Sequence, residues 1–233
     1  MDLKFLGSGS AFNPAMENSN AYFRVGGTFY MLDCGETAFG RVWNNESYLN
    51  CGEVVALITH LHADHVGSLG SLISYSFYVT GKKVTVAHPL ETIVELLDLL
   101  GIDRVCYEFK KLAVDEDCSL GESLRVKPIA VERVRNMKCF GYLLSDKHES
   151  VYFSGDARSV PDEVIAGLRD GSIGRIYQDT SNKESDHPTH ATLSYLEGII
   201  PLEFRNRVYS MHLDYDYCEL LRSKGFEVIK VER

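Results

Sequence analysis

Apolar stretches with two different periods alternate along this chain. Residues 53–60, EVVALITH, form a continuous apolar and β-branched run, which is typical of a strand covered on both faces. Residues 3–10, LKFLGSGS, predict a strand that ends in a glycine-rich turn, and residues 20–35 predict two strands joined at Gly26-Gly27. The first quarter of the chain is therefore expected to be mainly strand.

Longer amphipathic segments follow and predict helices among the strands. Residues 66–81 and 89–101 predict helices on either side of a strand over 82–88. Residues 123–134 and 141–156 alternate and turn like antiparallel strands. The remainder favours helix over 161–171, 191–200 and 215–225, and strand over 174–180, 206–214 and 226–232.

Both halves of the chain thus combine strands with helices. This favours an α/β fold in which two mixed β-sheets pack face to face with helices outside, an αββα four-layer sandwich. With 233 residues and no linker, repeat or low-complexity segment, the chain is expected to form one domain over residues 1–233.

Composition narrows the class of protein. The chain has no apolar run near the roughly 20 residues that cross a bilayer, and no secretory signal, so a cytoplasmic location without membrane contact is expected. The six cysteines form no C-x-x-C pair, which favours reduced thiols. A formal charge of -9 disfavours non-specific binding to nucleic acid.

The most unusual stretch is ITHLHADHVGSLG, residues 58–70. It places His60, His62, Asp64 and His65 within six positions, directly after an apolar strand and before a predicted helix. Imidazole and carboxylate together suit Zn²⁺, with Mn²⁺ or Fe²⁺ as alternatives. In extended geometry His60 and His62 point to one side, whereas Asp64 and His65 follow a bend, which indicates two metal positions. The competing reading makes Asp64 a cap for a helix that begins near Val66.

The motif H-x-H-x-D-H resembles that of the metallo-β-lactamase fold superfamily. FLGSGSAF, YMLDCG with Asp33, VYFSGD with Asp156 and VYSMHLD with His212 follow in that family's order. The resemblance implies the αββα fold and one or two metal ions in each chain. It implies six ligands: His60 and His62 for one metal, Asp64, His65 and His212 for a second, and Asp156 as a bridge. Asp33 would orient a ligand histidine by accepting its ring N–H.

One expected ligand is missing. The family places a further histidine before the bridging aspartate, and the corresponding position here falls on or near Arg133. The first metal is then held more weakly, with Glu132 as an added ligand, or only the second site is filled. Arg133 either contacts a substrate phosphate or is a solvated strand residue.

His190, in the HAT element, resembles a residue of the branch that contains tRNA 3′-processing endonucleases and cyclic nucleotide phosphodiesterases. It would be the general acid, with Asp64 as the other catalytic residue, and His187 is a weaker candidate for the same position. His88 and His148 are expected to be structural or exposed.

The short format resembles most the anti-Pycsar phosphodiesterases of bacteria and phages. This implies a phosphodiesterase that opens the 3′,5′-cyclic phosphate of small nucleotides by metal-bound hydroxide, with an anti-defence role. It also implies a homodimer in the cytoplasm of a bacterium or of a phage's host. The alternatives are a tRNA 3′-processing-type endoribonuclease, disfavoured because no long arm separates Arg133 from Asp156, and a non-catalytic nucleotide-binding protein with a degenerate metal site.

Overall fold

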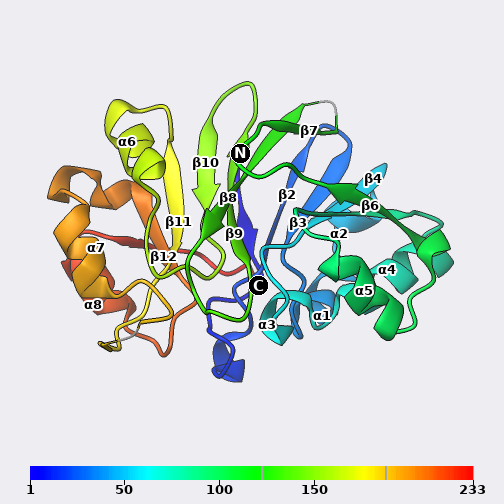
Figure 1. Ribbon diagram of the computed structural model, residues 1–233, viewed down its shortest axis with the longest axis horizontal. Helices are drawn as coiled ribbons and strands as arrows, with labels where there is room; N and C mark the ends of the chain where they lie inside the picture. The colour runs from blue at the N-terminus through cyan, green and yellow to red at the C-terminus, as the bar shows by residue number, and fades with distance from the viewer. Residues whose placement is uncertain (122, 187, 233) are drawn as a thin grey trace.

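The computed structural model describes residues 1–121, 123–186 and 188–232, and these residues form two mixed sheets (Figure 1). The first sheet has the order β1-β2-β3-β4-β5-β6. Strand β2 is antiparallel to its neighbours β1 and β3, and β3 to β6 run parallel. The strands are β1 (Lys4–Phe5), β2 (Ala21–Val25), β3 (Thr28–Leu32), β4 (Glu53–Leu57), β5 (Val84–His88) and β6 (Tyr107–Lys111).

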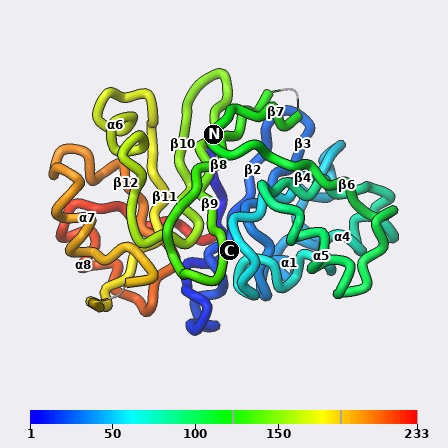
Figure 2. Tube along the Cα trace, viewed as in Figure 1, coloured from blue at the N-terminus to red at the C-terminus, as the bar shows by residue number. Residues whose placement is uncertain are grey.

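The second sheet also has an antiparallel part and a parallel part, and its strand order is β13-β12-β11-β10-β9-β8-β7. Strands β7 to β10 are antiparallel neighbours, and β10 to β13 run parallel. Figure 2 shows that the chain completes the first sheet before it builds the second. The strands are β7 (Cys118–Leu120), β8 (Leu124–Val131), β9 (Cys139–Ser145), β10 (Ser150–Phe153), β11 (Arg175–Asp179), β12 (Val208–Met211) and β13 (Glu227–Val228).

Helices cover the outer face of each sheet (Figure 1). The first sheet carries α1 (Ala38–Val42), α2 (Glu46–Leu49), α4 (Leu69–Tyr78) and α5 (Thr92–Leu99). The second carries α6 (Asp162–Asp170), α7 (Leu193–Ile199) and α8 (Cys218–Ser223). The short helices α3 (Ala63–Val66), η1 (Pro14–Met16), η2 (Arg104–Cys106) and η3 (Leu202–Arg207) lie in connections.

The period of two along the strands explains the layers. In β3, Phe29 and Met31 pack under the first set of helices, whereas Tyr30 faces the other sheet. In β10, Phe153 joins Tyr30 in the core between the sheets, and Tyr152 packs under α6 and α7. Three apolar layers therefore separate four layers of secondary structure, which confirms the predicted αββα sandwich.

The strands and helices predicted from the sequence are present, with shorter bounds at several ends. The hairpin at Gly26-Gly27 is confirmed, with Val25 paired to Thr28 and Gly26 at a φ of 59°. Sequence reasoning missed α1, α2, β6 and β7, which are three to five residues long and have little periodicity. All six cysteines are free, as expected. Within the described ranges no helix is long and apolar enough to cross a membrane.

Candidate metal centre

The predicted metal ligands and their neighbours follow strands that end at one edge of the molecule. Asp33 follows β3, the His60 stretch follows β4, Asp156 follows β10 and His212 follows β12. Because β3 and β4 are parallel, and β10 to β12 are parallel, these carboxyl ends gather in the same way as ligand sites in other α/β folds. Asp33 and His212 both have a φ of 59°, so the chain bends sharply at each.

The turn after β4 carries four of the predicted ligands. His62 is the N-cap of α3, and Asp64 lies inside that helix without capping it, so the reading of Asp64 as a helix cap is wrong. Gly35 packs against the turn so closely that an added Cβ would lie 1.9 Å from the carbonyl oxygen of Asp64. The Asn20 side chain donates to the same carbonyl and accepts from the Gly35 N–H. The backbone around Asp64 is thus held from two sides.

Four side chains converge to form what we call the four-donor cluster, which consists of Asp64, His65, Asp156 and His212. Nε2 of His65 lies 3.1 Å from Oδ2 of Asp64 and 3.1 Å from Oδ1 of Asp156. Nε2 of His212 lies 3.1 Å and 3.3 Å from the same two oxygens. All four residues are buried.

Charges within the four-donor cluster stabilise one another. Burial lowers the pKa of His212, but Asp156, Asp179 and Asp64 outweigh this effect and raise the pKa to about 10. Burial likewise opposes the protonation of His65, yet Asp156 and Asp33 hold its pKa well above the usual value. The pKa values of Asp64 and Asp156 are lowered despite burial, by the two histidines beside them. Two carboxylates therefore face two imidazolium rings.

The four-donor cluster fits a divalent ion. Nε2 of His65 and Oδ1 of Asp156 are buried and, among the described residues, neither has a hydrogen-bond partner, although they are 3.1 Å apart. Such atoms indicate a common point between them that would accept a cation. Two imidazole nitrogens and two carboxylate oxygens are a donor set that Zn²⁺, Mn²⁺ and Fe²⁺ accept.

Asp33 lies where a residue that orients His65 is expected. Its Oδ2 is 2.7 Å from Nδ1 of His65, so the ring nitrogen that faces away from the cluster donates to it. Thr59 donates to both oxygens of Asp33, through its N–H at 2.7 Å and its hydroxyl at 2.8 Å. This network fixes the rotation of the His65 ring with Nε2 directed into the cluster.

Asp179 plays a matching role for two histidines, and sequence reasoning missed it. Its Oδ1 lies 3.4 Å from Nδ1 of His212, and its Oδ2 lies 2.6 Å from Nδ1 of His190. The ring of His190 stacks on that of His212 at 5.0 Å. Asp179 is the last residue of β11, and an aspartate at the carboxyl end of a strand, as at Asp33 and Asp156, was the signal that could have identified it.

His190 therefore lies beside the four-donor cluster, as predicted for a general acid. Its side chain keeps 22% exposure, so it borders solvent. Burial lowers its pKa, but the carboxylate of Asp179 outweighs that effect and raises the pKa above the usual value. His187 lies outside the described residues. His88 is buried and donates to the Ile58 carbonyl, and His148 is exposed, which agrees with the roles expected for them.

His60, His62 and Asp156 form a second group, with a guanidinium among them. We call it the arginine-capped cluster, made of His60, His62, Asp156 and Arg133. Nε2 of His60 lies 3.1 Å from Nδ1 of His62 and 3.7 Å from Oδ2 of Asp156. Nη2 of Arg133 lies 2.5 Å from the same Oδ2, and its Nη1 contacts both ring nitrogens of His62. A second dication at this point would meet the guanidinium, so these donors do not fit it.

Arg133 and Glu132 differ from the sequence predictions. Both follow β8, which ends at Val131, and the side chain of Arg133 is only 8% exposed, so its reading as a solvated strand residue is wrong. Glu132 is 72% exposed and pairs with Arg158, and it belongs to none of the groups of side chains that could hold a metal ion among the described residues. The expectation that Glu132 supplements the first metal site is therefore wrong in this structure.

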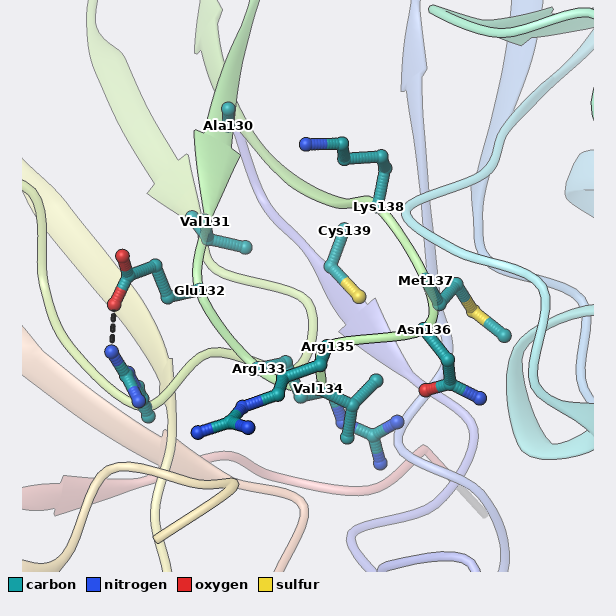
Figure 3. A pocket seen from close by; sticks show the side chains of 11 residues that line it. Ala130, Val131, Glu132, Arg133, Val134, Arg135, Asn136, Met137, Lys138 and Cys139 are labelled. Atoms are coloured by element: carbon teal, nitrogen blue, oxygen red, sulfur yellow. Dashed lines mark hydrogen bonds and ion pairs between the residues drawn. The ribbon is translucent and has the colours of Figure 1, made fainter. Parts of the chain in front are cut away.

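A cavity of about 730 Å³ opens beside Arg133 (Figure 3). The loop between β8 and β9 lines most of it, and its charged lining includes Arg133, Arg135, Lys138 and Arg158. The one carboxylate in that lining, Glu132, pairs with Arg158. This surface is basic in a chain whose formal charge is -9, which favours an anionic ligand.

Comparisons with known proteins agree with this arrangement. The family model described as Anti-Pycsar protein Apyc1 matches residues 1–230. The Anti-Pycsar protein Apyc1 of Paenibacillus harenae is 26% identical over 224 residues, which cover 91% of this chain and 89% of the relative. That of Bacillus phage BSP38 is 26% identical over 231 residues, 90% of this chain and 88% of the relative. The ribonuclease Z of Bacillus mycoides is 26% identical over 232 residues, 95% of this chain and 72% of the relative.

A solved structure shows the same fold. The metallo-β-lactamase fold protein YhfI from Bacillus subtilis superposes with a TM-score of 0.76 at 16% identity, over 97% of this chain and 94% of that one. The fold predicted from the H-x-H-x-D-H motif is thereby confirmed. The family match over almost the whole chain, on a fold that gathers buried Asp and His clusters at one edge, shows that this protein belongs to the Anti-Pycsar protein Apyc1 family and is a metal-dependent hydrolase.

Proposed function

We propose that this protein is a phosphodiesterase that opens the 3′,5′-cyclic phosphate of small cyclic nucleotides. The observation that carries this proposal is a cavity lined by Arg133, Arg135, Lys138 and Arg158, whose Arg133 pairs with Asp156 of the four-donor cluster. Guanidinium and ammonium groups bind phosphate oxygens, and the acidic remainder of the surface repels polyanions. A small anion with one scissile phosphodiester fits both properties.

Each part of the site has a role in such a reaction. Asp64, His65, Asp156 and His212 would hold a divalent ion, with Asp33 and Asp179 fixing the two histidine rings. When bound, the ion supplies a Lewis acid and lowers the pKa of a coordinated water. Water would add to phosphorus and give up one proton to solvent, and the P–O bond to one ribose oxygen would break. His190, whose pKa is raised by the carboxylate of Asp179, would give its proton to that departing oxygen and take up another from solvent.

The length of the chain near the cavity supports a small substrate. Strands β9 and β10 form a tight hairpin, in which Asp146 accepts from the backbone of His148 and Glu149. No long arm that could grip tRNA therefore leaves this part of the described chain. The names of the Apyc1 relatives in Paenibacillus and Bacillus phages add support for an anti-defence role, in the cytoplasm of a bacterium or of a phage's host.

The deciding experiment is turnover of a panel of cyclic mononucleotides by protein loaded with Zn²⁺ or Mn²⁺. We expect conversion to linear nucleoside monophosphates, detected by liquid chromatography, and loss of turnover in Asp64→Ala and His65→Ala. His148→Ala is the matched control, because that histidine is exposed and lies in the β9–β10 turn. No turnover of any panel member by protein with confirmed metal content would overturn the proposal.

The alternative is a ribonuclease, favoured by the similarity to the ribonuclease Z of Bacillus mycoides. Incubation with 3′-extended tRNA separates the two. Cleavage at the 3′ end with no turnover of cyclic nucleotides would favour the ribonuclease.

We also propose a homodimer. It is supported by apolar side chains at the ends of α4 and α5, where Tyr78, Val79, Leu99 and Leu100 are exposed. Light scattering after size-exclusion chromatography tests it, because a mass of one chain, 26.2 kDa, would exclude a stable dimer.

A further inference from the structure

The donors of the arginine-capped cluster already have a cation. Nη2 of Arg133 approaches Oδ2 of Asp156 at 2.5 Å, and Nη1 contacts the ring of His62. His60, His62 and Asp156 each offer one ligand atom to an ion, and these atoms lie within 4.8 Å of one another. The planar guanidinium spans them, so the point at which they converge is filled by the side chain.

We propose that the guanidinium of Arg133 takes the place of a second metal, so that this chain holds one divalent ion, in the four-donor cluster. This proposal concerns the metal centre of the proposed function and rests on that function only for the assignment of the centre. The number of ions that the chain binds does not depend on the substrate.

Charge and burial support one ion rather than two. The Arg133 side chain is 8% exposed and that of Asp156 is 1% exposed, so water screens their interaction weakly. A guanidinium carries a positive charge and has no lone pair to offer a metal. A dication placed among His60, His62 and Asp156 would therefore meet a fixed positive charge within a few ångströms, and a third nitrogen donor is absent.

The same geometry gives Arg133 a role in the reaction. Asp156 contributes Oδ1 to the four-donor cluster and Oδ2 to Arg133, so one carboxylate lies between the ion site and the guanidinium. Arg133 also lines the basic cavity. Its remaining N–H groups can donate to a phosphoryl oxygen of a bound substrate. The guanidinium thus supplies the positive charge of a second metal ion, but it does not lower the pKa of a bound water as a metal ion does.

Metal counting tests the proposal directly. Purified protein is stripped, titrated with Co²⁺ or Zn²⁺, and measured by native mass spectrometry and by the visible absorption of Co²⁺. We expect about one ion in each wild-type chain and about two in Arg133→His, since the new imidazole completes a set of three nitrogens and a carboxylate. The variant is also expected to gain a second Co²⁺ absorption component.

The matched control is Arg135→His, which adds a histidine to the same loop at an exposed position. It should stay at one ion. Arg133→Gln removes the charge without adding a strong ligand, and it serves as the second test if Arg133→His fails to fold. We expect it to bind a second ion more weakly than the first. Circular dichroism checks the fold of each variant.

Two outcomes would overturn the proposal. Wild-type protein that binds two ions with similar affinity would show that the guanidinium moves aside. Folded Arg133→His and Arg133→Gln that both stay at one ion would show that Arg133 does not exclude the second. A wild-type chain that holds one ion but turns over no cyclic nucleotide would contradict the proposed substrate and leave this proposal intact.

Discussion

The two clusters share Asp156 but neutralise it in different ways. In the four-donor cluster, two carboxylates face His65 and His212, whose pKa values are raised, so protons balance the charge and an ion can replace them. In the arginine-capped cluster the pKa values of His60 and His62 are lowered, chiefly by burial, and a guanidinium supplies the positive charge.

One short motif thus supplies ligands to two sites whose charges are balanced differently. His60, His62, Asp64 and His65 lie within six residues, yet they serve two environments because the chain bends between them at the start of α3. In the four-donor cluster a metal ion can replace the protons of the histidines, whereas in the arginine-capped cluster the cation is the guanidinium of Arg133.

Asp64→Asn should have the largest effect, because it removes a carboxylate that belongs to the four-donor cluster alone. Loss of the ion removes a contribution of several kcal/mol to the barrier, so kcat should fall by at least about 10³-fold. Metal analysis and turnover of a cyclic nucleotide measure both losses. An Asp64→Asn protein that still holds its ion tightly would show that the arginine-capped cluster is the binding site.

His190→Ala should lower kcat by about 10²-fold, because a general acid contributes to proton transfer and does not hold the ion. Metal content should stay unchanged, which distinguishes this variant from Asp64→Asn. With a p-nitrophenyl phosphodiester, whose leaving group needs no proton, the loss should shrink. An equal loss with both substrates would assign His190 a structural role instead.

Metal binding should release protons, and the number released reports which cluster is used. His212, with a pKa of about 10, and His65 are protonated near neutral pH without an ion, and both must be neutral to coordinate one. Affinity should therefore rise with pH, by about tenfold for each proton and pH unit, between about pH 6 and 9.

Calorimetry in two buffers of different ionisation enthalpy measures this release. The lowered pKa values of Asp64 and Asp156 mean that the carboxylates add no protons in this range. Binding through His60 and His62 would release almost none, because burial lowers the pKa of His60 well below its usual value. Equal heats in both buffers would therefore contradict binding in the four-donor cluster.

The sequence predicts those parts of the fold and of the site whose residues lie close together in the chain. The strand pattern and the H-x-H-x-D-H stretch are local, and they were enough for the two sheets and for the pairing of Asp64 with His65. Asp33 could be placed only through the resemblance to the metallo-β-lactamase fold superfamily, because an aspartate in a turn after a strand has no distinctive pattern of its own. Asp179 was overlooked, since its partners His190 and His212 lie 11 and 33 positions away in the chain and meet it only across β11 and β12.

Arg133 and Glu132 show the limit most clearly. Sequence reasoning placed both on a strand, with Glu132 as an added metal ligand and Arg133 either beside a substrate phosphate or in solvent. In the structure β8 ends at Val131, and the loop that follows directs Arg133 inward and Glu132 toward Arg158. That choice depends on where the strand ends, which is the least predictable property of an element.

Glu132→Gln should have the smallest effect of these variants. Glu132 and Arg158 are 72% and 46% exposed, so their ion pair should contribute less than about 1 kcal/mol to the free energy of unfolding. Metal content and the proton release on binding should match the wild type, because the carboxylate belongs to neither cluster. Chemical denaturation and the same calorimetry measure these quantities. A lost ion or a changed proton count would mean that Glu132 turns inward when the ion binds, and the arginine-capped cluster would then possess the second carboxylate that a dication needs.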